Sequence, residues 1–185
     1  MKQKNSGKIY RFSLDFDLGY GFSELLDFSD ISDFSGRLLY IFRVIEKDNS
    51  PNIEDIKSSG ILFGPVPLSN YPNVRGKGAW KLIGEINNYS ISVPILKNVQ
   101  GNYTQKDWSK IDTWYKLYNF EDRSSYCSYE EVRRLELPVL YRMKDIQTRA
   151  TMQLLIEAGK KVNEYYDLNV STPFLRQYFL ESFHY

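Results

Sequence analysis

The chain has 185 residues, of which 42% are hydrophobic and 25% charged, a composition typical of a globular protein that buries a core without a metal or a disulfide. Its single cysteine, Cys127, excludes an internal disulfide, and a single histidine, His184, argues against a zinc site and a Cys–His catalytic pair. The net charge is +1, but residues 15–55 hold ten acids and three bases, a balance that repels nucleic acid and favours a basic partner.

A hairpin of two strands is predicted at the start of the chain. Residues 8–16 alternate between apolar and polar side chains, which is typical of a half-buried strand. The apolar face consists of Tyr10, Phe12, Leu14 and Phe16. A turn at 17–19 leads into a second strand at 20–26, where Tyr20 stands between two glycines. Glycine in a strand marks a bulge, a bend or a close approach of another group.

The middle of the chain predicts further strands. Residues 37–46 are dense in apolar and β-branched side chains and are the best candidate for a central strand. A polar loop is expected before it at 29–35. After it, residues 48–59 are expected to form either a loop or a short helix around 53–56. Shorter strands are expected at 61–63, 79–86, 91–96 and 114–120. Because proline cannot donate to a sheet, Pro65, Pro67 and Pro72 exclude a central strand across 65–72, and Pro94 confines 91–96 to an edge or a bulge.

Helices are predicted toward the end of the chain. Ser128, with Glu131 three residues later, indicates a capped helix over 128–137. The strongest helical pattern covers 145–166, where Gly159 either weakens the helix or ends it early. A last short helix is expected at 173–182, with Pro173 at its first position.

This order of elements predicts an α+β fold. We expect a curved, antiparallel and mostly β N-terminal domain of about 5–7 short strands over residues 1–120. A helical C-terminal extension, residues 121–185, is expected to pack on it.

The acidic residues suggest no reaction chemistry. Asp15 and Asp17 flank a turn, but the stretch lacks the lysine or histidine of a metal nuclease and the spacing of a calcium loop. Residues 75–78 lack the Ser or Thr that follows Gly-Lys in a phosphate-binding loop. Basic and aromatic residues alternate over 106–116, but acids among them favour a core-and-rim interpretation over nucleic-acid binding. The sequence therefore predicts no catalytic residue, cofactor or metal.

The acidic segment predicts either a solvated loop or a contact surface for a basic protein. Aromatic anchors inside a charged rim are a common interface arrangement. The candidate partner-binding residues are accordingly Tyr20, Glu24, Asp27, Phe28, Asp30, Asp33 and Phe34. Residues 1–8 are polar and basic, and no apolar run is long enough to cross a bilayer. We therefore expect a cytoplasmic protein without a signal peptide or a membrane partner.

Two glycine–aromatic stretches together resemble immunity-protein family 26 of bacterial polymorphic toxin systems. The aromatic strand at 9–14 and the Gly-Tyr-Gly-Phe run at 19–22 are similar to the family's opening, and residues 80–84 are similar to its later Trp strand ending in Ile-Gly. An apolar strand at 38–45 and the Pro-apolar step at 94–96 also match. The resemblance covers roughly the first half of the chain. It implies a mostly β, non-enzymatic cytoplasmic protein that neutralises a cognate toxin by binding it.

The leading hypothesis is therefore a toxin-neutralising protein. Its acidic segment suits a basic target such as a nuclease, because opposite fields speed association. The alternative is an accessory or scaffolding subunit of a bacterial anti-phage defence complex that docks through residues 128–185. A hydrolase that uses the N-terminal carboxylates is the third hypothesis. The pattern specifies no oligomeric state, and Trp80 is interpreted as a core residue.

Overall fold

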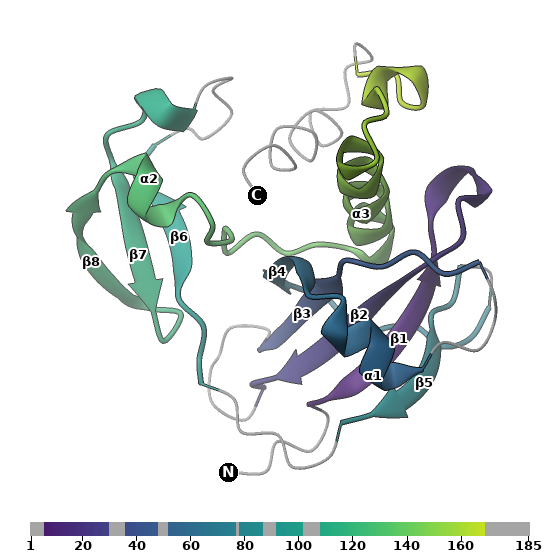
Figure 1. Cartoon of the computed structure of the whole chain (residues 1–185). Helices are drawn as coiled ribbons and strands as arrows, with labels where there is room; N and C mark the ends of the chain where they lie inside the picture. The colour runs from purple at the N-terminus through teal and green to yellow at the C-terminus, as the bar shows by residue number, and fades with distance from the viewer. Residues whose placement is uncertain are drawn as a thin grey trace.

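The computed structural model describes residues 6–29, 36–47, 52–76, 78–86, 92–101 and 108–168. Its strands form two antiparallel sheets, one in the order β4-β3-β2-β1-β5 and the other in the order β6-β7-β8. A long helix, α3, follows them in the chain, so the predicted α+β class is confirmed. Figure 1 shows the five-stranded sheet beneath α3 and the three-stranded sheet to one side of it.

The first sheet contains the predicted hairpin and the predicted central strand. Its strands are β1 (Lys8–Ser13), β2 (Tyr20–Asp27), β3 (Arg37–Phe42), β4 (Ile61–Pro67) and β5 (Lys81–Glu85). β2 is the middle strand, and β3 lies beside it in the interior of the sheet, as predicted. β4 passes through Pro65 and Pro67 as an edge strand, which confirms that these prolines exclude a central position.

The second sheet differs from the prediction at both ends. Its strands are β6 (Leu96–Val99), β7 (Trp114–Tyr118) and β8 (Asp122–Cys127). The strand expected at 91–96 is wrong, because β6 begins only at Leu96, after Pro94. β7 is not the last strand: Asn119 and Phe120 turn the chain with φ of 50° and 69°, and β8 pairs back. This turn spans residue 120, and the division into two domains there stays a prediction.

The helices are shorter than predicted. α1 (Ile53–Ser58) agrees with expectation, while α2 (Tyr129–Val132) covers only the start of 128–137. The 3-10 turns are η1 (Asp15–Asp17), η2 (Trp108–Lys110) and η3 (Val162–Glu164). α3 (Met143–Glu157) ends at Gly159, whose φ is 69°. The Lys160 N–H then donates to the Leu155 carbonyl, a common closure at a glycine. The expected helix to residue 166 is therefore wrong, and the early end at Gly159 is right. The helix expected at 173–182 lies outside the described residues.

Each face of the first sheet buries a different set of partners. One face packs against α3, and its core includes Phe12, Leu25, Ile41, Phe63, Ile146, Ala150 and Leu154. The opposite face packs against α1 at one end through Phe22 and Ile56. At its other end, Leu26 and Leu38 meet Leu117 of the second sheet. The first sheet is therefore covered on both faces, by α3 on one face and by α1 and the second sheet on the other.

The two glycine–aromatic stretches of the sequence converge on Phe12. Its ring stacks on that of Trp80 at a centroid distance of 4.7 Å, and Trp80 is buried. Gly21 lies opposite Phe12 in the β1–β2 register. A Cβ atom at Gly21 would lie 2.7 Å from the Phe12 ring. Gly21 is therefore required for space, and Trp80 is a core residue, as interpreted from the sequence.

A buried ion pair joins α3 to the rest of the molecule. The Arg149 guanidinium donates to both carboxylate oxygens of Glu136, at 2.8 and 2.9 Å. Their side chains are only 1% and 4% exposed. The Arg149 guanidinium carbon also lies 4.1 Å from the centre of the Phe63 ring. The Glu136 carbonyl accepts from the N–H of Lys97 in β6, so the pair connects α3, the first sheet and the second sheet.

We predict that Gly21→Ala destabilises the protein by about 1–3 kcal/mol, because the new methyl group displaces Phe12 from Trp80. Urea denaturation measures this loss. Phe12→Leu removes the obstructing ring atoms, so the double variant Gly21→Ala/Phe12→Leu should lose less than the sum of the two single variants. Strict additivity would contradict the close approach.

We also predict that Glu136→Gln destabilises the protein by about 3–5 kcal/mol, because it leaves the Arg149 charge buried without its counter-ion. Chemical denaturation is the measurement. Replacing both partners, as in Glu136→Leu/Arg149→Met, should recover most of the loss, because two apolar side chains need no compensating charge. A double variant as unstable as Glu136→Gln would show that the ion pair itself is not the source of the effect.

Candidate partner-binding surface

The predicted contact residues divide into an exposed member and a buried group. Tyr20, the first residue of β2, is partly exposed, and the Arg11 guanidinium carbon lies 4.1 Å from the centre of its ring. Glu24 and Asp27 are only 4% and 5% exposed, and Phe28 is fully buried. Asp30, Asp33 and Phe34 lie outside the described residues. The contact set as a whole therefore stays a prediction.

One interpretation of the acidic segment was a solvated loop, and for Glu24 and Asp27 this interpretation is wrong. Both lie in β2, which has paired strands on both sides and covered faces. The Asp27 carboxylate accepts from the N–H and the hydroxyl of Ser29 and from the Tyr71 hydroxyl. Burial raises the pKa of Tyr40, and the Glu24 charge raises that pKa further. These two acids are therefore part of the interior.

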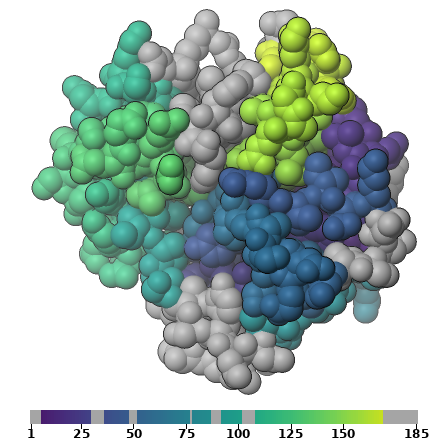
Figure 2. All heavy atoms as spheres, in the orientation of Figure 1, coloured from purple at the N-terminus to yellow at the C-terminus, as the bar shows by residue number. Residues whose placement is uncertain are grey.

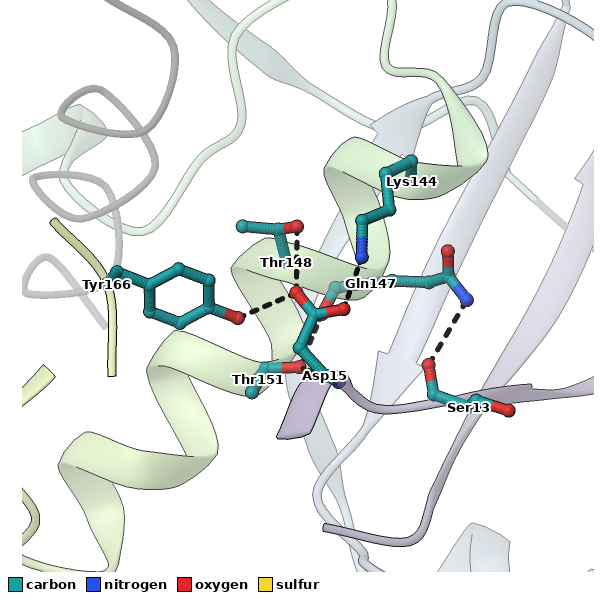
Figure 3. A network of polar contacts seen from close by, with 7 residues as sticks. All are labelled: Ser13, Asp15, Lys144, Gln147, Thr148, Thr151 and Tyr166. Atoms are coloured by element: carbon teal, nitrogen blue, oxygen red, sulfur yellow. Dashed lines mark hydrogen bonds and ion pairs between the residues drawn. The ribbon is translucent and has the colours of Figure 1, made fainter. Parts of the chain in front are cut away.

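A further acid, Asp15, lies at the turn between β1 and β2 and has partners on two other segments of the chain. We call the turn Asp15–Asp17 the hairpin tip. The Asp15 carboxylate pairs with the Lys144 ammonium and accepts from the hydroxyls of Thr148 at 3.0 Å and Tyr166 at 2.8 Å. Its backbone N–H donates to the Thr151 hydroxyl at 3.0 Å. Figure 3 shows these side chains converging on Asp15 from α3 and from the segment after it.

A further contact ties the hairpin to the same helix. The Gln147 amide donates to the Ser13 carbonyl at 3.1 Å. Gln147 and Thr148 each follow Lys144 and precede Thr151 by three or four residues, so the four side chains lie on one face of α3. Burial raises the pKa of the Tyr166 hydroxyl, and its hydrogen bond to the Asp15 carboxylate raises it further. Tyr166 therefore stays a hydrogen-bond donor to Asp15 across the physiological pH range.

The residues after Asp15 adopt a backbone conformation that side chains disfavour. Phe16 has φ 60° and ψ 29°, and Asp17 has φ 53°. Such left-handed positions cost about 1–3 kcal/mol each when the residue is not glycine. Phe16 is 48% exposed, so its predicted place on the apolar face of the first strand is wrong. The strand ends at Ser13, and the left-handed turn points the ring outward.

Two tyrosines support the exposed Phe16 ring from the side. The rings of Tyr165 and Tyr166 meet it edge to face, at centroid distances of 5.4 and 4.8 Å. In Figure 2 the purple atoms of the N-terminal hairpin reach the surface beside the yellow-green atoms that end the described chain. The hairpin tip therefore presents two exposed side chains, Phe16 and Asp17, next to Asp15, which its contacts hold in place.

The geometry at Asp15 does not resemble that of a two-carboxylate hydrolase. Such an enzyme needs a second acid across a cleft, whereas Asp15 faces Lys144, Thr148 and Tyr166.

Burial raises the pKa of the half-buried Cys127 thiol, and the Glu131 charge also raises it, as suits a passive thiol. Among the described residues no His, Cys, Asp or Glu group is placed to hold a metal ion. No described helix has the length and apolar character to span a membrane.

Sequence reasoning missed the hairpin tip because alternation placed Phe16 in a strand. One available signal was the aspartate on each side of it, since aspartate tolerates left-handed backbone better than most residues. The partners of Asp15 follow it by more than 120 residues in the chain. No local pattern indicates that pairing.

The first sheet and the hairpin tip lie in the part of the chain that matches a known family. The family model described as Immunity protein 26 matches residues 5–108, more than half of the chain. The chain belongs to the Immunity protein 26 family, which confirms the resemblance seen in its glycine–aromatic stretches. Membership indicates a protein that neutralises a toxin through protein contact, and immunity proteins are generally not catalytic. No curated protein and no solved structure matches the chain.

We predict that Tyr166→Phe changes the pH dependence of stability. Because folding raises the pKa of Tyr166, this group stabilises the protein below its unfolded pKa of about 10, and the contribution is lost as the pH rises beyond that value. The stability difference between wild type and Tyr166→Phe should therefore be larger at about pH 8 than at about pH 11. Urea denaturation at both pH values measures it. The exposed Tyr126→Phe serves as the control, and a constant difference for Tyr166→Phe would contradict the assignment.

Proposed function

We propose that this protein is a cytoplasmic immunity protein that neutralises a cognate bacterial toxin by binding it. The observation that carries the proposal is the family match over residues 5–108, which includes all five strands of the first sheet and the hairpin tip. The Asp15 carboxylate is engaged with the protein's own Lys144, Thr148 and Tyr166 side chains, as expected for a protein that acts by contact.

The toxin that fits this protein best is basic, with a nuclease as the leading class. The acidic balance of residues 15–55 supports this choice, because opposite charges accelerate association and help to select the partner. Within the predicted contact set, the proposal now rests on Tyr20, Asp30, Asp33 and Phe34. The buried Glu24, Asp27 and Phe28 support β2 from within.

Co-expression with the cognate toxin, sought first in the neighbouring gene, tests this function. We predict that the chain restores growth and that the two purified proteins elute as one complex in which the toxin activity is lost. Survival without a complex would contradict neutralisation by contact. Recovery of a defence ATPase or nuclease assembly in place of a toxin would favour the accessory-subunit alternative.

The same assay tests the acidic contact residues. The variant Asp30→Lys/Asp33→Lys should bind more weakly than wild type, and the loss should shrink at high salt. Glu121→Lys/Asp122→Lys makes the same charge change at two exposed positions where the β7–β8 turn enters β8 and should bind like wild type. Equal binding by all three proteins would exclude Asp30 and Asp33 from the interface.

A further inference from the structure

The hairpin tip combines an exposed aromatic ring, a strained backbone and the partly buried Asp15 carboxylate, which α3 and Tyr166 hold in place. We propose that it is the part of this protein that grips the toxin: Phe16 enters an apolar pocket of the toxin, and Asp17 pairs with a lysine or arginine at the rim of that pocket. This inference rests on the proposed function and names the surface that performs it.

The first argument is that the fold holds Phe16 in an unfavourable place. A hydrophobic ring gains by burial, and the alternation of β1 would continue into the core if the strand went on. Instead, β1 ends at Ser13, and two consecutive left-handed residues, Phe16 and Asp17, turn the chain and leave Phe16 48% exposed. Strain of this kind persists only where the surroundings impose it, and it gathers at sites that bind ligands.

The second argument is that neighbouring side chains impose the strained conformation of the hairpin tip. Asp15 is held by Lys144, Thr148 and Tyr166 through its carboxylate and by Thr151 through its backbone. These contacts fix the residue directly before Phe16. The rings of Tyr165 and Tyr166 limit the positions open to the Phe16 ring. Because the Phe16 ring is already ordered in the free protein, it loses little conformational entropy on binding, which favours tight association.

The third argument concerns charge and the surface next to the tip. Lys144 is engaged by Asp15, whereas the exposed Asp17 makes no ion pair with any residue in the described ranges. The side chain of Ile45, 39% exposed, lies close to Gly19, two residues after the tip. Tyr20, a predicted contact residue, begins the strand that leaves the tip. An aromatic anchor beside an acid fits an apolar pocket with a basic rim.

The test uses the full chain and its toxin, with binding measured by titration and protection measured by growth. Phe16→Asn removes the ring but keeps a residue that tolerates the left-handed backbone. It should weaken toxin binding by more than about tenfold, the scale of an interface hot spot, with little change in the melting temperature. Asp17→Lys should slow association, most strongly at low salt.

Matched controls are available on the second sheet. Tyr126→Ala removes a tyrosine that is 57% exposed, and Asp122→Lys reverses an exposed acid; both should bind like wild type. Asp15→Ala should weaken binding through the tip and should add little in the Phe16→Asn background, because both changes remove the same contact.

The outcomes separate this inference from the proposed function. If the wild-type chain neither binds nor neutralises the toxin, the proposed function fails, and this inference fails with it. If the wild type binds the toxin and both Phe16→Asn and Asp17→Lys bind it as tightly as wild type, the hairpin tip does not grip the toxin. The proposed function is then unaffected, and this inference is overturned. If Phe16→Asn lowers the melting temperature and leaves binding unchanged, the ring has a structural role and the inference is overturned.

Discussion

The packing of α3 onto one apolar face of the first sheet is the constraint on which this structure depends. The family-matched strands form a sheet whose two faces are both apolar, and each face must be covered. α3, which lies outside residues 5–108, covers one of them. It brings Arg149 into the interior, where the charge is tolerable only beside Glu136. Because the Glu136 backbone also holds Lys97 of β6, this ion pair orients the helix, the segment before it and the second sheet together.

The same helix determines the shape of the hairpin tip. Lys144, Thr148 and Thr151 share one helical face, which meets Asp15 at the end of β1. Their contacts offset the backbone strain at Phe16 and Asp17. A short loop on such a base can present an exposed ring with little freedom, which suits a protein whose task is to bind one partner.

Local patterns predicted the fold well where burial follows a simple period. The alternation of β1, the apolar run of β3 and the Ser128–Glu131 cap each produced an element of the expected type at the expected start, although each element is shorter than predicted. Prediction failed where no such period exists. β8 is polar and exposed on both faces, so only its pairing with β7 makes it a strand. Phe16 continues the alternating pattern of β1 in the sequence. The chain nevertheless turns at Asp15, because Asp15 forms hydrogen bonds with Thr148 and Thr151 of α3.

The sequence by itself determined the α+β class, the family and the role of the glycine–aromatic stretches, because strand alternation, a glycine beside an aromatic ring and a helix cap act over a few residues. Only the tertiary structure decided which acids are available to a partner. Glu24 and Asp27 are interior because β2 became the middle strand, and Asp15 is an anchor because α3 returns over the first sheet. Burial of a charge depends on residues that are distant in the chain, and folding alone brings those residues close to it.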